Sequence, residues 1–391
     1  MSDTRKTTKP NVPNLRFPGF EGEWELKKLS AYLYENKERN RNGEFNKSDV
    51  LSVSGDCGIV NQIELLGRSF AGKSVADYHV VRTDDIVYTK SPLKEYPYGI
   101  VKYNNGQDGI VSTLYAVYHH KDNVDGQFVE YYFTNPQRTN RYFKPIVRIG
   151  AKHDMKIGNE EVLDSFVVFP GLEEQRKITE MLSLLDLRIA IQNKVIEKYE
   201  SLIKALAHEI IGKNAPNTML SECVCCTSST LKESDLSDAG AVPAYGAAGI
   251  SGFIDSALSD GDSILITKDG SGVGSLRYVV GHHSFVGTLN SMTPKEGVYL
   301  PYIYYALQNV CFESYRTGQA IPHIYFKDYG KEALYCPSFD DQKRLAKGLE
   351  MIDAKIGIER AAIQNLQLVK AYLLSAMFIW IFPVADNPFE I

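Results

Sequence analysis

Several features of membrane, secreted and metal-binding proteins are missing from this sequence. No apolar run in the 391 residues approaches the ~18 that are needed to cross a bilayer. The segment from Met1 to Pro13 is polar and no apolar stretch follows it, unlike a secretory signal. Six cysteines are too few for a disulfide framework in a chain of this length, so free thiols are expected. We therefore expect a cytoplasmic protein.

The motifs of metal sites and of common enzymes are also missing. Cys223, Cys225 and Cys226 have no second Cys or His pair at zinc-site spacing. The glycine-rich run Gly270–Ser275 lacks both the G-x-G-x-x-G spacing and a P-loop lysine, so it indicates a turn. Gln137 follows Asn135-Pro136, so the segment lacks the Asn-Pro-Pro-aromatic signature with which amino-methyltransferases hold a flipped base. These absences predict a protein without its own catalytic or metal site.

The composition is that of a soluble globular protein with several domains. Hydrophobic residues make up 44% of the chain and charged residues 23%, and the length exceeds that of one ordinary core. The net charge of −5 argues against a protein that coats DNA through phosphate contacts alone. Any contact with DNA must be local or shared with a partner.

An internal repeat organises the chain. The segment 169–178 (FPGLEEQRKI) matches 336–345 (CPSFDDQKRL) at an offset of 167 residues, and Asp186 and Asp353 continue the match. Both copies have a proline and then two acidic residues, which is typical of a helix start. The repeat predicts two equivalent helices.

Both predicted helices carry a heptad pattern. In the first, apolar residues alternate at spacings of four and three from Ile178 to Ile210, and the second repeats this seam from Leu345 to Met377. Each seam has a polar interruption at the same place, Gln192 and Glu359. A helix of about 40 residues would be ~60 Å long. We expect the two helices to pair with each other, although two unrelated amphipathic helices on separate cores would show a similar periodicity.

A mixed, strand-rich segment precedes each helix. The run 83–90 (TDDIVYTK) parallels 260–268 (DGDSILITK), Val111-Ser112-Thr113 parallels Val286-Gly287-Thr288, and Tyr131-Tyr132-Phe133 parallels Tyr304-Tyr305-Ala306. Since the framework repeats while the loops differ, the two segments are expected to bind different targets.

Basic residues gather late in the first segment. From Arg138 to Lys156 there are six Lys and Arg against one acid, Asp154, with aromatic residues interleaved. Basic side chains position phosphates, and polar side chains reach base edges; a solvated helix face is the alternative. The second segment keeps a glycine and a histidine at the matching place, Gly318 and His323. Over 214–338 it is acidic, with 7 Lys and Arg against 12 Asp and Glu.

Together with the opening segment 14–24 (NLRFPGFEGEW), these features resemble the specificity subunits of Type I restriction-modification systems over nearly the whole chain. The resemblance implies an α+β fold in which two mixed α/β target-recognition domains are separated by two long antiparallel coiled-coil helices, in a pseudo-two-fold repeat. The expected boundaries are 1–171 for the first recognition domain, 172–213 for the first spacer helix, 214–338 for the second recognition domain, 339–382 for the second spacer helix and 383–391 for the tail.

The resemblance also implies a function and partners. Each domain would read one half of a bipartite double-stranded DNA target, and the helices would set the gap between the halves. Two methyltransferase subunits would bring S-adenosylmethionine, and two restriction subunits would bring ATP and Mg²⁺, so no cofactor is expected in this chain. The apolar run Phe378–Phe382 is too short to span a membrane and is expected to dock on the N-terminal segment or a partner.

Candidate residues follow from position and chemistry. The predicted DNA contacts are Lys90, Lys94, Arg138, Arg141, Lys144, Arg148, Lys152, His153, Lys268, Ser271, Arg316, Gln319, His323, Tyr325 and Lys327. The predicted helix-pairing residues are Leu182, Leu185, Ile189, Ile196, Leu349, Ile352, Ile356 and Ile363.

Two alternatives stay open on sequence alone. A standalone DNA-modifying enzyme would itself bind S-adenosylmethionine, and a scaffold that binds only proteins would confer no sequence-dependent protection on DNA.

Overall fold

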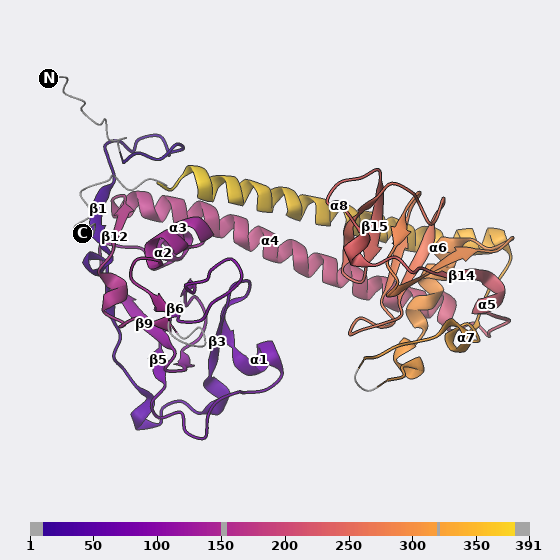
Figure 1. Cartoon of the computed structure of the whole chain (residues 1–391), viewed down its shortest axis with the longest axis horizontal. Helices are drawn as coiled ribbons and strands as arrows, with labels where there is room; N and C mark the ends of the chain where they lie inside the picture. Colours follow the sequence, from indigo (N-terminus) through magenta and orange to yellow (C-terminus); the bar gives the residue numbers. More distant parts are fainter. Residues whose placement is uncertain (1–10, 150–154, 319–320, 380–391) are drawn as a thin grey trace. The chain divides into compact units, whose positions relative to one another are not determined.

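The chain folds into two compact units (Figure 1). The computed structural model describes residues 11–149, 155–318 and 321–379. Unit 1 combines Met1–Ala190 with Gln364–Ile391, and unit 2 is Ile191–Ile363. Two long helices, α4 (Leu172–Ala207) and α8 (Phe339–Ala376), each contribute a segment to both units. The rest is mostly antiparallel sheet and short helix, which confirms the predicted α+β fold.

The core of unit 1 forms around a four-stranded antiparallel sheet in the order β2-β9-β6-β7. Strand β6 alternates its side chains between two layers: Ile86 and Tyr88 pack with the aromatic residues of α2 and α3, and Val87 packs with β3, β4, β5 and β8. Both faces of the strand are covered, and all four of its residues are buried. The elements are β1 Glu25–Lys28, β2 Leu33–Glu35, β3 Leu51–Ser54, β4 Gly58–Asn61, α1 Gln62–Leu66, β5 His79–Val81, β6 Ile86–Thr89, β7 Val101–Tyr103, β8 Gly109–Val111, β9 Tyr115–His120, α2 Gly126–Phe133, α3 Pro136–Phe143, β10 Arg148–Ile149, β11 Met155–Lys156 and β12 Phe166–Phe169.

Unit 2 repeats this plan. Its main sheet has the antiparallel order β14-β20-β17-β18, and the pair β13-β21 corresponds to β1-β12 of unit 1. A second sheet has the order β16-β15-β19. It corresponds in unit 1 to the hairpin β3-β4, which meets β8 through the parallel bridge between Val50 and Ile110. The elements are β13 Thr218–Met219, α5 Leu220–Cys223, β14 Val224–Ser228, β15 Val242–Gly246, β16 Gly249–Ile254, β17 Ser263–Thr267, β18 Leu276–Val279, β19 Ser284–Phe285, β20 Leu289–Pro294, α6 Leu300–Ala306, α7 Phe326–Tyr329 and β21 Ala333–Leu334.

The contacts correct one detail of the predicted repeat. The sequence comparison places Tyr131 opposite Tyr304. In the structure it is Tyr305 that corresponds to Tyr131, because each hydroxyl donates to the aspartate at the same position of its long helix, Asp353 and Asp186. The helical run is therefore shifted by one residue relative to the sequence match.

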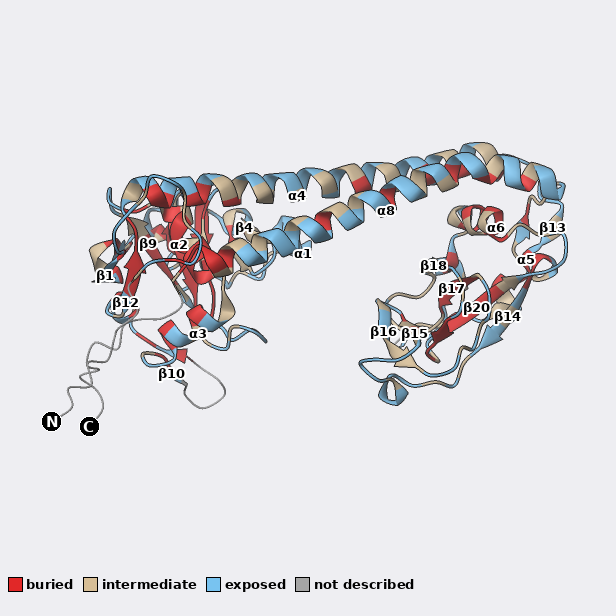
Figure 2. Cartoon of the chain, turned by 90° about the horizontal axis from the view of Figure 1, so that it is seen from above, coloured by how far each residue is buried: buried red, intermediate tan, exposed pale blue. Residues whose placement is uncertain are grey.

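Within each unit the segments of α4 and α8 lie side by side (Figures 1 and 2). In unit 1 the Lys370 ammonium group meets the Asp186 carboxylate at 2.5 Å. In unit 2 the two polar seam residues meet, with Gln192 Nε2 donating to Glu359 Oε2 at 3.2 Å. Of the predicted helix-pairing residues, Leu182, Ile196, Leu349, Ile356 and Ile363 are buried and Leu185, Ile189 and Ile352 are half-buried.

The end of α8 closes the core of unit 1. Phe378 is 1% exposed and packs against Trp24 and Phe128, with ring centroids 6.4 and 5.3 Å away. The Leu15 amide also donates to the Ala376 carbonyl at 2.9 Å. The first residues of the apolar run at the end of the chain thus pack against the N-terminal segment, while Trp380 to Phe382 lie outside the described residues.

Protonation of His79 is expected to destabilise unit 1 in acid. This side chain in β5 is 1% exposed, and burial together with the charges of Arg39 and Lys90 lowers its pKa to about 4. The unfolded pKa is ~6.5, so protons bind the unfolded chain first. The contribution of neutral His79 is fully present above about pH 6.5 and is lost as the pH falls toward 4, by as much as about 3 kcal/mol. Urea unfolding between pH 7 and pH 4 measures the loss.

The matched control is His79→Gln, which keeps a polar side chain but removes the titrating group. Its unfolding free energy should fall less over the same pH range. Equal slopes for the two proteins would show that another group controls the acid transition.

Candidate nucleic-acid interface

A turn and a neighbouring segment bring five predicted residues together in unit 2. The Ile324 amide donates to the Lys268 carbonyl at 3.0 Å, and the Gly270 amide donates to the Pro322 carbonyl at 2.9 Å. These bonds hold the end of β17 beside the segment that leads into α7. This terminal cluster consists of Lys268, Ser271, His323, Tyr325 and Lys327.

The side chains of the terminal cluster combine an aromatic surface with polar groups. Tyr325 is 46% exposed, and its ring lies 5.3 Å from the His323 ring and 5.3 Å from the Lys327 ammonium nitrogen. His323 Nδ1 lies 3.3 Å from Asp269 Oδ1, which orients the imidazole. Tyr325 and Lys327 are exposed and His323 is half-buried. Aromatic, imidazole and ammonium groups of this kind contact bases and phosphates. The cluster is the best candidate surface in unit 2.

Arg316 adjoins the terminal cluster through the backbone. Thr317 and His323 exchange two hydrogen bonds, Thr317 N to His323 O at 2.8 Å and the reverse at 2.9 Å, which closes a small hairpin. The Arg316 guanidinium is exposed and pairs with Glu313 at 2.5 Å. Gln319 lies outside the described residues. The hairpin thus brings a third cation toward the cluster although unit 2 is acidic in total.

In unit 1 the exposed cations lie on helix α3, after it, and on the antiparallel strand pair β10-β11. Arg141, Lys144 and Arg148 are exposed, and Arg148 is paired with Lys156 across the two short strands. Arg141 has further interactions within the protein. Lys94 is also exposed, on the loop between β6 and β7. Lys152 and His153 lie outside the described residues. This row of basic residues is the candidate surface of unit 1.

Arg138 does not belong to that surface, which corrects the sequence prediction. Helix α3 buries Arg138, Thr139, Tyr142 and Phe143 and turns Arg141 outward. The Arg138 guanidinium donates to the carbonyls of Tyr132 at 2.7 Å and Leu374 at 3.4 Å, and burial lowers its pKa to about 10. A guanidinium that is 4% exposed cannot reach a phosphate.

The position of Lys90 also corrects the sequence prediction, because its side chain bonds within the protein. Its ammonium group donates to the Ile157 carbonyl at 3.0 Å and to Asn159 Oδ1 at 2.6 Å. Burial lowers the pKa of this lysine. The side chain fastens β6 to the segment after β11, so its role is structural.

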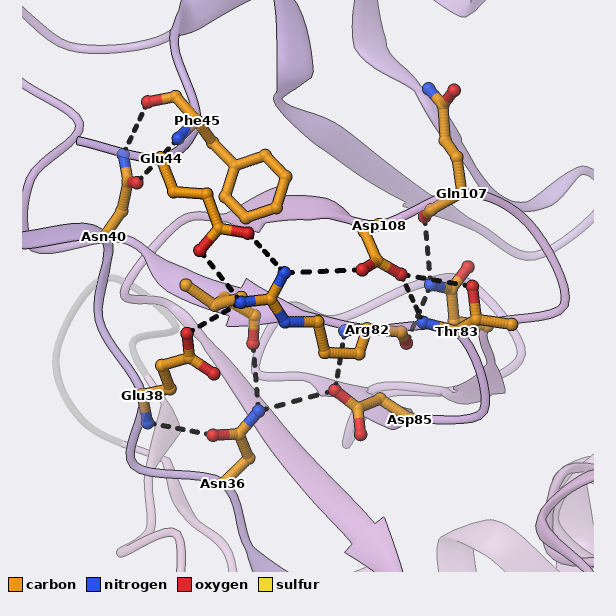
Figure 3. A network of polar contacts seen from close by, with 12 residues as sticks. Asn36, Glu38, Asn40, Glu44, Phe45, Arg82, Thr83, Asp85, Gln107 and Asp108 are labelled. Atoms are coloured by element: carbon orange, nitrogen blue, oxygen red, sulfur yellow. Dashed lines mark hydrogen bonds and ion pairs between the residues drawn. The ribbon is translucent and has the colours of Figure 1, made fainter. Parts of the chain in front are cut away.

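A cluster of ion pairs around Arg82 makes another surface of unit 1 unfavourable for DNA binding. Figure 3 shows the Arg82 guanidinium surrounded by three carboxylates, Glu44 at 2.5 Å, Glu38 at 2.9 Å and Asp108 at 3.3 Å. These ion pairs raise the pKa of Arg82. Three anions on one cation leave a negative surface that repels phosphate. The nucleic-acid surface of unit 1 is therefore expected on the basic row.

Two glutamines of the repeat have a role that sequence reasoning missed. Gln175 Oε1 accepts from the Asp125 amide at 2.9 Å, and its Nε2 donates to the Pro170 carbonyl at 2.9 Å. Gln342 makes the same pair of bonds, from the Tyr299 amide and to the Pro337 carbonyl, each at 2.8 Å. Both side chains are almost fully buried. The available signal was that only proline and glutamine are identical in the ten-residue repeat.

No helix within residues 11–149, 155–318 and 321–379 is long and apolar enough to cross a membrane. In the same residues, no group of three or more His, Cys, Asp or Glu side chains is placed to hold a metal ion.

Comparisons with known proteins agree with the architecture. Residues 224–368 match the family model of the Type I restriction modification DNA specificity domain. Among solved structures, the Type I restriction-modification S subunit from M. genitalium aligns with a TM-score of 0.61 and 17% identity, covering 95% of this chain and 100% of that one. HsdS from Thermoanaerobacter tengcongensis aligns with a TM-score of 0.36 and 15% identity, covering 93% and 97%.

A structure described for complex assembly and conformational transition of the type I R-M system gives a TM-score of 0.47 and 16% identity, covering 91% of this chain and 97% of that one. No curated protein sequence matches the chain. The predicted resemblance is thus confirmed: residues 224–368 match the Type I restriction modification DNA specificity domain, and the chain has the fold of the M. genitalium S subunit over nearly its whole length.

Proposed function

We propose that this chain is the DNA-reading subunit of a Type I restriction-modification complex, in which each unit reads one half of a split target. The observation that carries the proposal is the internal repeat. Each unit has the same four-stranded sheet order, followed by an equivalent long helix. Two related domains with different exposed side chains fit two different half-sites.

The residues proposed to contact DNA differ between the units. Unit 1 offers the exposed cations Lys94, Arg141, Lys144 and Arg148, and unit 2 offers the terminal cluster with Arg316. Lys152, His153 and Gln319 remain proposals from sequence. Because the chain is acidic in total, partner subunits would supply many phosphate contacts while this chain supplies base readout.

An apolar stripe on each long helix supports the docking of two methyltransferase subunits. On α4, Leu184, Ile191 and Leu202 are exposed, and the residues 167 positions later on α8 are also large, apolar and exposed. Spacings of 7 and 18 residues from the first member keep such residues on one helix face. Exposed apolar rows usually mark protein interfaces. The α8 stripe is Met351, Ile358 and Val369.

Equivalent stripes fit two copies of the same partner. In this assignment the methyltransferase subunits bring S-adenosylmethionine, two restriction subunits bring ATP and Mg²⁺, and this chain brings no catalytic group. The resulting complex would act on DNA in the cytoplasm.

The experiment is to co-express this chain with its cognate methyltransferase subunit and to map methylated adenines by single-molecule sequencing. The expected result is a split motif with one fixed gap, which is lost when this chain is omitted. A continuous motif, or methylation without this chain, would disprove the two-domain proposal. Binding of S-adenosylmethionine by the isolated chain would favour a standalone enzyme, and unchanged DNA protection without it would favour a scaffold.

A further inference from the structure

Each unit is fastened to its following long helix at two points, and both points recur in the other unit. The first is the buried glutamine, which joins the start of the long helix to the backbone at the start of α2 or α6. The second is a tyrosine on that short helix. Tyr131 donates its hydroxyl to Asp186 Oδ2 at 2.8 Å, and Tyr305 donates to Asp353 Oδ2 at 3.3 Å.

The spacing of the two points restrains rotation. Gln175 and Asp186 are 11 residues apart, as are Gln342 and Asp353. Eleven residues are close to three helical turns, or ~16 Å along one face. Ile178 and Leu182 of α4 also pack in the core of unit 1. The two hydrogen bonds on one face of the helix add directional restraints on the tilt of the domain and on its rotation about the helix axis.

The hydroxyl groups of the two tyrosines contribute hydrogen bonds in addition to the packing of their rings. Tyr131 and Tyr305 are 3% and 2% exposed, and burial raises the pKa of both, so each stays a hydroxyl donor. A hydrogen bond to a carboxylate is stronger than one between neutral groups, and the Tyr131 bond is the shorter of the two. Phenylalanine would fill the same space without this directional bond.

We infer that Gln175 with Tyr131, and Gln342 with Tyr305, are positioning residues that fix the angle of each recognition unit on its helix and thereby restrict the gap between half-sites. This inference rests on the proposed function. It adds a determinant to the proposed role of helix length: these contacts restrict how freely each unit turns on its own helix.

The test uses Tyr131→Phe and Tyr305→Phe in the complex with the methyltransferase subunit. The controls are Tyr142→Phe and Tyr302→Phe, which remove equally buried hydroxyls that donate within the domain, to the carbonyls of Val162 at 2.6 Å and Tyr335 at 2.7 Å. Methylation is mapped on plasmids that carry the two half-sites at the normal gap and at gaps one base pair shorter and longer. Thermal unfolding verifies that variants and controls are equally folded.

Tyr131→Phe and Tyr305→Phe are expected to raise the ratio of off-gap to normal-gap methylation about tenfold, which corresponds to about 1.4 kcal/mol. The bases read in each half-site should be unchanged. The controls should leave this ratio as in the unaltered chain. If Tyr131→Phe and Tyr305→Phe methylate only the normal gap, as their controls do, the inference is overturned and the proposed function is left intact. If the unaltered complex shows no split motif, the proposed function fails and the inference fails with it.

Discussion

Replacing Arg138 by alanine is expected to destabilise unit 1 by about 3–5 kcal/mol. The change leaves the carbonyls of Tyr132 and Leu374 without this donor and opens a cavity between the rings of Tyr132 and Phe378, which lie 4.9 and 5.0 Å from the guanidinium carbon. Urea unfolding of the purified chain measures the loss. The DNA target of the surviving folded protein should be unchanged.

Arg148→Ala is the matched comparison, since Arg148 is exposed on β10. Its unfolding free energy should stay within about 0.5 kcal/mol of the original. Its DNA binding should weaken by ~1–3 kcal/mol and lose discrimination in one half-site if the side chain contacts a base, or weaken uniformly if it contacts a phosphate. A stable Arg138→Ala protein with impaired DNA binding would contradict the buried assignment.

Charge on the α4 stripe is expected to remove one bound methyltransferase subunit. Leu184→Glu with Ile191→Glu would place two carboxylates where an apolar partner surface is proposed. Losing a buried leucine or isoleucine contact costs about 1.5–3 kcal/mol per side chain, before the cost of desolvating the new charges. Native mass spectrometry of the assembled complex should show a change from two copies to one.

Variants of the α8 stripe and of an unrelated exposed residue serve as controls for this prediction. Met351→Glu with Ile358→Glu should remove the other copy, and all four changes together should remove both. Leu66→Glu, at an apolar residue of α1 that is 51% exposed, should leave two copies bound. Two copies on the α4 variant would show that the stripe is not the docking surface.

The sequence predicted the fold better than it predicted the surfaces. Helix starts and the heptad seam recur at one offset, so two long helices and two related domains followed directly from the pattern. Arg138 and Arg141 are three residues apart on α3, and composition gives no sign that one is buried and the other exposed. The burial of Arg138 depends on Phe378, which is distant in sequence.

The roles of Gln175 and Gln342 could not be predicted for a related reason. Gln175 binds backbone groups, and backbone partners leave no mark on the sequence of the segment that supplies them. The one-residue shift of Tyr131 against Tyr305 arose because the two domains differ in loop length, so that an alignment by residue type alone chose the wrong tyrosine.

The position of Phe378 affects the order in which the two units can fold during synthesis. Unit 2 is one continuous stretch of chain, whereas the core of unit 1 needs Leu374, Met377 and Phe378. A ribosome that has synthesised residues 1–190 has therefore not yet supplied everything that this core contains. Domains generally fold as they are synthesised, from the N-terminus onward. Here the core of unit 1 is complete only after residue 378 has been synthesised, and all of unit 2 is available before that point.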